Sequence, residues 1–223
     1  MPIPRFDAAS SHDTGPGVDN PLTFAHTCGA NAKLLIVGVS IRTTAGQIVN
    51  GITYNAVALT KLEDKDSATP DVRAEFWYLK NPATGAPQNI IVTLSAAARF
   101  CAGGISLESV NLNTTFGTQV EAIGDSQLAT VNVVSNASEL VVDVMGKQNT
   151  ANAVTVGAGQ TQRYKDETRA AATANDSLVG GSTEPGANPT TMSWSWANNN
   201  REWAIIAVGV RGAPSGTKGY IIG

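Results

Sequence analysis

Few residues of this chain could do chemistry, and they are widely spaced. The only histidines are His12 and His26, and His26 lies two residues before Cys28, one of two cysteines. Together with the distant Cys101, His26 and Cys28 could supply three metal ligands, but zinc sites usually contain close ligand pairs such as C-x-x-C. We therefore predict no metal site and expect His26 to be an ordinary strand histidine. Both cysteines are expected to be buried thiols, with a single disulfide bond as the alternative.

Motifs for covalent or acid–base catalysis are not found in the sequence. A Ser-His-Asp triad needs a positioned nucleophile, and no G-x-S-x-G motif occurs. The glycines of the segment 212–218 have the wrong spacing for a phosphate-binding loop. Two carboxylates for glycoside hydrolysis need only approach each other in space, and no particular pair stands out. We predict no catalytic residue, no cofactor and no enzymatic activity.

One segment concentrates acidic side chains: Glu63, Asp64, Asp66 and Asp71. Loop carboxylates of this kind can bind Ca²⁺, which takes six or more oxygen ligands. Lys61 and Lys65 lie among them, and this favours a solvated loop over the range 63–71 without a metal.

Aromatic side chains are the remaining candidates for a binding site, because sugars stack on exposed rings. The candidates are Tyr54, Trp77, Trp194, Trp196 and Trp203. Trp194 and Trp196 alternate with serines, so their apolar face is expected to point into a core. Trp77 and Tyr54 are kept as candidates for stacking on a glycan.

The tryptophan-rich segment 191–212 also indicates the fold. Met192, Trp194 and Trp196 alternate with small residues, which is typical of a strand with one buried face. Three asparagines then favour a turn, and 203–210 is apolar at both parities, as in a strand buried on both faces. We predict an antiparallel hairpin of these two strands.

Short strand patterns with turn signals between them continue along the 223 residues. About a dozen such strands, and no helical period, predict a single all-β domain, an antiparallel β-sandwich of jelly-roll type with extended termini. We divide the chain into an N-terminal strand and loop (1–21), the sandwich (22–212) and a tail (213–223). No repeat is visible beyond a short similarity between 34–42 and 204–212, which we expect to be central strands and candidate neighbours. Gly103-Gly104 is expected to mark a bulge or bend.

Charge and hydropathy exclude two classes of partner. The net charge is −3 and no basic run occurs, which argues against a nucleic-acid surface. The longest apolar runs are too short to span a membrane. The first residues lack a basic region followed by an apolar one, so no secretion signal is expected and synthesis in the cytoplasm is predicted.

Several segments, in a fixed order, carry a resemblance to a known family. They are TFAHTCGANAKLLIVGVS (23–40), VNGITYNAVALTKL (49–62), AEFWYLKNPATGAPQNIIVTLS (74–95), FCAGGISLESVN (100–111), ELVVDVMG (139–146) and TTMSWSWANNNREWAIIAVGVR (190–211). Their order resembles a jelly-roll-like domain that recurs in bacteriophage structural proteins and as a module in large bacterial surface proteins. The FWYLKNPATG segment and the closing tryptophan segment carry most of the resemblance.

The resemblance implies a structural role and no catalytic motif. We expect a virion protein assembled in the host cytoplasm: a capsid decoration or stabilising protein, or a tail-associated component. A homo-oligomer, with a trimer favoured, is expected to contact the major capsid protein or other virion proteins. Apolar residues near the two termini are candidates for subunit docking: Ile3, Phe6, Tyr220, Ile221 and Ile222. The alternative is a carbohydrate-binding module or a receptor-binding head.

Overall fold

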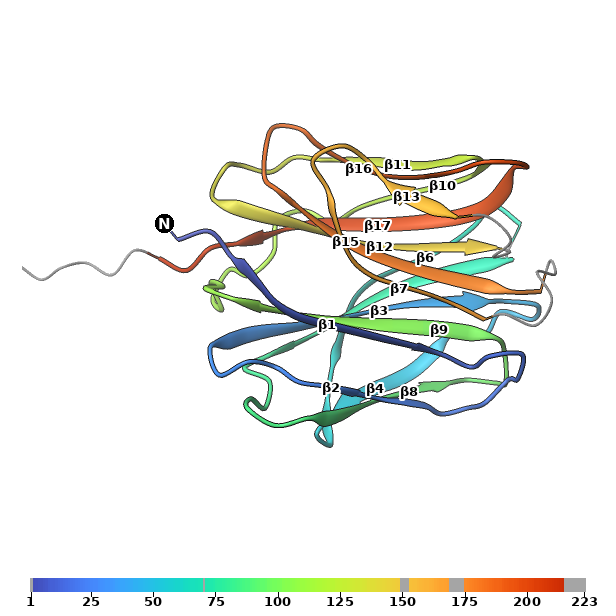
Figure 1. The fold of residues 1–223 in the computed structure, drawn as a ribbon, viewed down its shortest axis with the longest axis horizontal. Coiled ribbons are helices and arrows are strands. Elements are labelled where there is room, and N and C mark those ends of the chain that lie inside the picture. Colours follow the sequence, from blue (N-terminus) through green and yellow to red (C-terminus); the bar gives the residue numbers. More distant parts are fainter. Residues whose placement is uncertain (1, 70, 149–152, 169–174, 215–223) are drawn as a thin grey trace, which may run out of the picture.

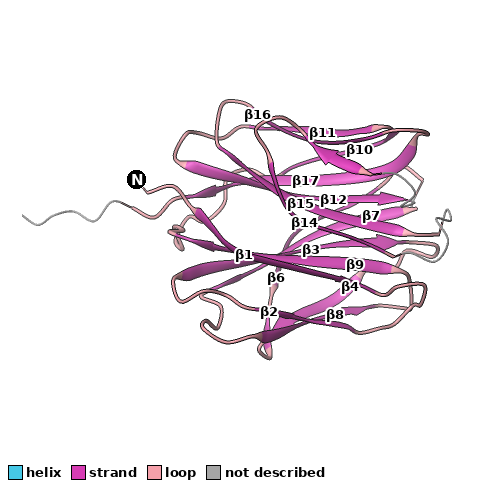
Figure 2. Ribbon diagram, viewed as in Figure 1, coloured by secondary structure: helices cyan, strands magenta, loops and turns pink. Residues whose placement is uncertain are grey.

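A computed structural model describes residues 2–69, 71–148, 153–168 and 175–214 of the chain. In these ranges the backbone forms strands, turns and loops and no helix (Figure 2). The strands are β1 (Arg5–Asp13), β2 (Leu22–His26), β3 (Ala32–Arg42), β4 (Val49–Tyr54), β5 (Val57–Ala58), β6 (Thr60–Asp66), β7 (Val72–Lys80), β8 (Gln88–Leu94), β9 (Phe100–Glu108), β10 (Val120–Ser126), β11 (Leu128–Val133), β12 (Glu139–Gln148), β13 (Val154–Val156), β14 (Thr161–Glu167), β15 (Ser177–Pro185), β16 (Thr190–Trp196) and β17 (Arg201–Arg211). Accordingly, no helix of the described ranges has the length and apolarity to cross a membrane.

The strands form four antiparallel sheets that lie face to face (Figure 1). The N-terminal inner sheet has the order β1-β9-β3-β7-β6, and the N-terminal outer sheet has the order β2-β8-β4-β5. The C-terminal inner sheet has the order β10-β17-β12-β15-β14, and the C-terminal outer sheet has the order β11-β16-β13. The two inner sheets pack against each other and each carries its own outer sheet. The predicted all-β antiparallel sandwich is therefore confirmed, as two sandwiches packed together.

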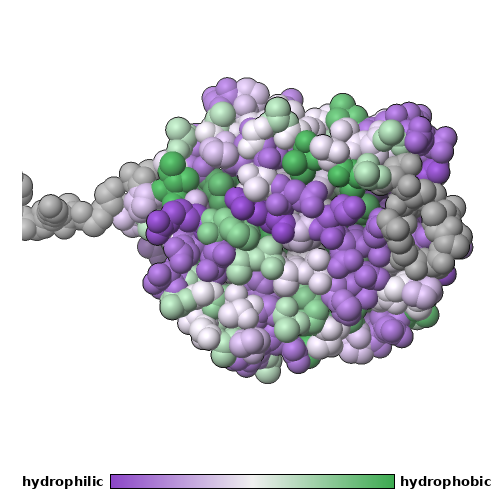
Figure 3. All heavy atoms as spheres, viewed as in Figure 1, coloured by the Kyte–Doolittle hydropathy of each residue, from purple (hydrophilic) through white to green (hydrophobic). Residues whose placement is uncertain are grey.

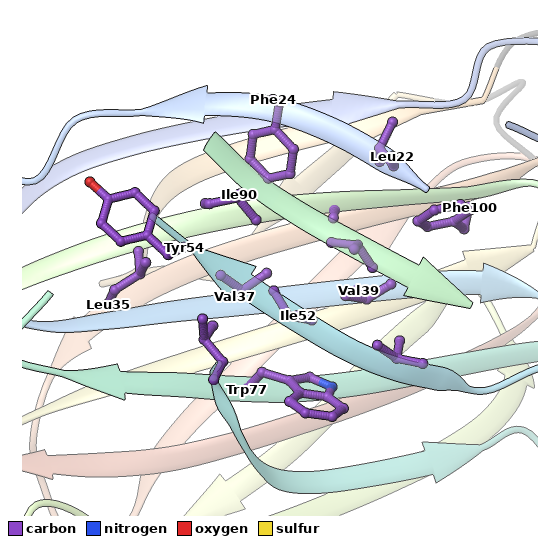
Figure 4. Packing of buried hydrophobic residues seen from close by; sticks show 14 of the residues in the cluster. Leu22, Phe24, Leu35, Val37, Val39, Ile52, Tyr54, Trp77, Ile90 and Phe100 are labelled. Atoms are coloured by element: carbon purple, nitrogen blue, oxygen red, sulfur yellow. The ribbon is translucent and has the colours of Figure 1, made fainter. Parts of the chain in front are cut away.

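Three apolar cores separate the four sheets. The N-terminal core lies between the N-terminal sheets (Figure 4), the central core between the two inner sheets, and the C-terminal core between the C-terminal sheets. Strand β3 is apolar at both parities because it borders two cores. Its Leu35 and Val37 enter the N-terminal core, whereas Leu34 and Ile36 enter the central core.

The strand order of the N-terminal half is repeated in the C-terminal half. The two inner sheets match strand for strand across their width: the order β1, β9, β3, β7, β6 in one corresponds to β10, β17, β12, β15, β14 in the other. In the outer sheets β2, β8 and β4 correspond to β11, β16 and β13, and β5 is extra. Across the central core β3 faces β12, β9 faces β15, β7 faces β17, β1 faces β14 and β6 faces β10. Each contact maps onto another when the halves are exchanged, as in a two-fold dimer.

The predicted tryptophan hairpin is wrong, although both of its strands exist. Strand β16 pairs with β11 and β13, whereas β17 pairs with β10 and β12. The two strands lie in different sheets, and both contribute side chains to the C-terminal core. The apolar residues of β16 alternate because this strand belongs to an outer sheet with one solvated face. Those of β17 are continuous because this strand belongs to an inner sheet that is buried on both faces. Asn198 and Asn199, with φ of 61° and 79°, turn the chain from one layer to the next.

Other expectations also change. The similar segments 34–42 and 204–212 lie in β3 and β17, which belong to different sheets and are not paired. The first four residues of the predicted acidic loop 63–71 are strand, because β6 runs to Asp66. The pairing of β9 with β1 and β3 continues through Gly103 and Gly104 without a shift, so no bulge lies there.

The termini of the predicted domain are less separate than the three ranges suggest. Strand β1, in the range 1–21, is the edge strand of the N-terminal inner sheet and pairs with β9. Residues 109–119 connect the two halves and contact the end of β17, where Val110 bridges Gly212 and Phe116 bridges Val210. Of the predicted tail, Ala213 and Pro214 are described, and Ala213 N–H donates to the carbonyl of Ser109 at 2.8 Å.

Candidate functional site

The two halves meet along a closely packed seam. The ring of Tyr164, on β14, lies against Gly103 and Gly181, where a Cβ atom would collide with it. Ser40 Oγ and Ser177 Oγ lie 2.8 Å apart across the same boundary, and Arg99 Nη1 donates to Asp176 Oδ1 at 2.9 Å. Because glycine leaves room for the tyrosine ring, the inner sheets approach closely at this point.

An open groove of about 670 Å³ lies at one edge of this seam, where β1 meets β14. We call it the seam groove. Its lining is mainly apolar and comes from both halves, and includes Ile3, Pro4, Phe6, Leu140, Arg163 and Pro185. The N-terminal half contributes the segment that leads into β1, and the C-terminal half contributes residues of β12, β14 and β15. A concave site between two packed units is a common place for binding.

Two arginines lie on the rim of the seam groove. The guanidinium of Arg163 lies 4.0 Å from the centre of the Phe6 ring, and its Nε donates to Thr183 Oγ1 at 2.8 Å. Burial lowers the pKa of Arg163, which stays protonated in any ordinary buffer. Arg5 is largely exposed and its Nη2 lies 3.3 Å from Glu108 Oε2. The apolar floor therefore ends in a rim that carries Arg163 and the Arg5–Glu108 ion pair.

The structure brings together two of the predicted docking residues. Ile3 is 44% exposed and Phe6 is half-buried, and both line the seam groove. Tyr220, Ile221 and Ile222 lie outside the described residues.

The two predicted glycan-stacking residues lie inside the N-terminal core (Figure 4). Tyr54 is fully buried, and its hydroxyl donates to the carbonyl of Ala83 at 3.2 Å. Burial raises the pKa of Tyr54 to about 12. Trp77 is 8% exposed, and its Nε1 donates to Glu75 Oε2 at 2.9 Å. In this conformation neither ring offers a face to a sugar, because both faces are used for packing.

The tryptophans of the closing segment are core residues, as predicted. Trp194, Trp196 and Trp203 are at most 6% exposed and lie in the C-terminal core. Trp194 Nε1 donates to Asp143 Oδ2 at 2.8 Å, and Ser182 donates from its N and its Oγ to Asp143 Oδ1 at 2.7 and 2.8 Å. Burial raises the pKa of Asp143 to about 7 despite these three donors.

A polar network that no sequence pattern indicated joins β1, β2 and β9. Ser10 Oγ lies 2.8 Å from His26 Nδ1, and His26 Nε2 lies 3.2 Å from Ser106 Oγ. Ser106 donates to Asp7 Oδ2 at 2.6 Å, and Gly29 N–H donates to the same oxygen at 2.7 Å. Since Ser106 uses its proton on Asp7, it accepts from His26 Nε2–H, and His26 Nδ1 accepts from Ser10. The order resembles a nucleophile–base relay.

The chemistry of this network is nevertheless poor for catalysis. Burial lowers the pKa of His26 to about 4, so the imidazole accepts a proton reluctantly near neutral pH. His26 is 2% exposed and Ser106 is fully buried, and their polar atoms are occupied by each other, by Ser10 and by Asp7. We interpret the network as a clamp that holds the edge strand β1 on the sandwich. The signal available in the sequence was that His26 lies two residues after Phe24, on the same face of a strand, which places both side chains inward.

Neither predicted alternative for a metal site is assembled. Cys28 is buried near the N-terminal core, whereas Cys101 lies in the central core, and both are free thiols. Asp64 and Asp66 accept hydrogen bonds from Arg73, a buried side chain on β7. Across the described ranges, no three His, Cys, Asp or Glu side chains group around a common point. The acidic residues of β6 neutralise an arginine instead.

Known proteins offer no match to this chain: no protein-family model, no curated protein and no solved structure matches it.

Proposed function

We propose that the chain is a non-enzymatic structural protein of a bacteriophage virion that acts through protein–protein contacts. It serves there as a capsid decoration or stabilising protein or as a tail-associated component. The observation that carries the proposal is the seam groove, because it unites Ile3 and Phe6 with Leu140 and Pro185 in one open apolar surface. An apolar surface with a charged rim is the usual form of a protein docking site. The resemblance of the sequence to phage structural domains supports the same role.

A jelly roll in each half is part of the proposal. Counting β5 and β6 as one bent strand, the N-terminal half has eight strands, with the order 1-8-3-6 in the inner sheet and 2-7-4-5 in the outer sheet. This is the order that two successive Greek keys would give. The C-terminal half has the same order, with its fifth strand entirely in the inner sheet. Two jelly rolls in tandem therefore replace the single one expected from the sequence.

The proposed partners are further copies of the chain, with a trimer favoured by shell symmetry, and the major capsid protein or other virion proteins. We do not extend the proposal to glycans, because Trp77 and Tyr54 are buried. A non-enzymatic role fits the weak basicity of His26, the base of the one relay-like network described above.

Incorporation into particles tests the proposal. Particles purified from a lysate are expected to contain the chain as a stoichiometric component by mass spectrometry. Ile3→Asp is expected to reduce incorporation, because it places a carboxylate on the apolar groove. The fold itself should tolerate the substitution, because Ile3 is an exposed residue. Val18→Asp, at an exposed loop position away from the groove, is the matched control. Particles that lack the chain entirely would refute the role.

A further inference from the structure

The two outer sheets carry no charged residue. None of the residues in β2, β4, β5, β8, β11, β13 and β16 is Asp, Glu, Lys or Arg, although these types make up 15% of the chain. The charges lie on the inner sheets and in the loops. Figure 3 agrees for one face of the molecule, where strongly hydrophilic residues cross the middle and mostly paler ones cover the N-terminal outer sheet.

Small uncharged side chains cover both outer faces. On the C-terminal outer sheet the exposed residues include Thr130, Asn132, Thr155, Thr191 and Ser195. On the N-terminal outer sheet they include Thr23, Ala25, Ala58, Asn89 and Thr93. Neither face presents an ion that a charged partner could pair with.

Exposed aliphatic residues form a second, independent signal. Among the described residues, seven large hydrophobic side chains are exposed, and four of them lie on an outer-sheet strand or directly beside one: Ile48, Val57, Leu128 and Val134. Val134 is the most exposed of all, at 72%. Single exposed aliphatics are ordinary on a surface. Their concentration on two charge-free layers is the composition of an interface core, where charged residues are depleted.

The position of the two faces indicates the kind of partner. They belong to corresponding sheets of the two halves and lie at opposite ends of the four-layer stack (Figure 1). When two uncharged faces pack together, no charged side chain is desolvated, so the contact avoids the desolvation penalty of buried charges. Copies of the chain also carry the same net charge of −3, and contact through the outer faces keeps those charges apart.

We propose that the outer faces are self-association surfaces, with the N-terminal outer sheet of one copy packing on the C-terminal outer sheet of a second copy. The inference rests on the proposed function, because it names a partner for a protein that acts by protein–protein contacts. None of the outer-sheet strands lines the seam groove, so this contact adds to an oligomer held through the groove. A head-to-tail contact between opposite ends extends the assembly without closing it.

Sedimentation velocity of the full chain over a range of concentrations tests the inference. The average mass of the sedimenting protein is expected to rise with concentration for the unmodified chain. Thr130→Lys on the C-terminal outer face and Thr93→Lys on the N-terminal outer face are each expected to weaken the association about tenfold or more, because a charge is buried without a partner. Thr60→Lys, the same exposed substitution on the inner strand β6, should leave it unchanged. Equal melting temperatures verify that all three variants fold.

Mixing the two face variants identifies the mode of contact. In a head-to-tail contact the intact face of each variant fits the other, so the mixture forms pairs that neither variant forms alone. Association of one variant alone to the same extent as in the mixture would overturn the head-to-tail arrangement. A mass that does not rise with concentration in the unmodified chain, or that rises as much in Thr130→Lys and Thr93→Lys as in the unmodified chain, would overturn the inference as a whole. The proposed function would survive that result if the chain is still found in purified particles.

Discussion

The ring of Tyr164, from the C-terminal half, lies directly on the backbone of Gly103, from the N-terminal half. This contact crosses the central core and joins β14 to β9. The contact explains why a glycine lies in the middle of the regular strand β9. The absence of a side chain at Gly103 lets the Tyr164 ring approach the backbone, and no bulge is formed. The same ring also fills the space beside Gly181, on the neighbouring strand β15.

Gly103→Ala is expected to lower the free energy of unfolding by about 1–3 kcal/mol, because the added methyl group overlaps the ring of Tyr164. Urea denaturation measures the loss. Gly51→Ala, a strand glycine with open space at its Cβ position, is the control and should change stability by less. Equal effects of the two substitutions would mean that the contact is not a constraint.

His26 makes stability depend on pH. Its pKa is about 4 in the folded chain, because burial disfavours the charged imidazole, and its ordinary value is 6.5. In this window the unfolded chain binds a proton that the folded chain does not, so the contribution of His26 is complete above pH 6.5 and lost as the pH falls toward 4. The loss amounts to about 3 kcal/mol. In His26→Gln, the pH dependence measured by urea denaturation should lack this component, whatever the overall stability of the variant.

Asp143 acts with the opposite sign. Its pKa is raised from 3.8 to about 7 by burial, so the folded chain holds a proton that the unfolded chain has released. This contribution is complete below pH 3.8 and is lost as the pH rises through 7. Asp143→Asn removes it, and the stability of the variant should rise more steeply with pH than that of the unmodified chain. Because His26 and Asp143 titrate in overlapping windows, their effects offset each other in the unmodified chain, and a parallel profile in the variant would contradict the assignment.

Arg73 is expected to be essential for stability through Glu75. Glu75 is fully buried and accepts from Arg73 Nε at 2.8 Å, and also from Val49 N–H at 3.0 Å. Arg73→Met leaves that carboxylate without its cation and should cost about 3–5 kcal/mol. The double variant Arg73→Met with Glu75→Gln should recover part of the loss, because the buried charge is removed as well. Thermal denaturation of the two variants decides it: a double variant no more stable than the single one would rule out this explanation.

The sequence predicts the strands of this fold far better than their partners. A strand that is apolar at both parities, such as β3 or β17, must lie between two cores, and this prediction is confirmed. Proximity along the chain misled the pairing of β16 with β17, since a turn of asparagines can join two layers as well as two neighbouring strands. The repeated strand order left almost no trace in the sequence, because packing requires apolar side chains at given positions and not particular ones.

Candidate site residues could be predicted from the sequence only where the prediction did not depend on knowing whether the side chain is buried. Ile3 and Phe6 were found from their apolar character near a terminus, and both line the seam groove. Trp77 could not be assigned because strand alternation gives both faces of β7 aromatic residues, and the depth of each face depends on the layers stacked on it. Tyr54, on β4, is buried by the same stacking of layers. The network of Ser10, His26 and Ser106 joins residues as much as 80 positions apart, which no local pattern reveals.

The joining of two corresponding halves in one chain affects the number of grooves. In a dimer of identical subunits, every feature at one edge of the interface recurs at the other. Here Lys65 and Glu121, with Nζ and Oε1 2.5 Å apart, join β6 to β10 at one edge, while Phe6 and Arg163 stack at the corresponding edge between β1 and β14. The two edges therefore differ in their side chains. A ligand of the seam groove should consequently bind with a stoichiometry of one per chain, whereas a dimer of identical subunits would offer two equivalent grooves.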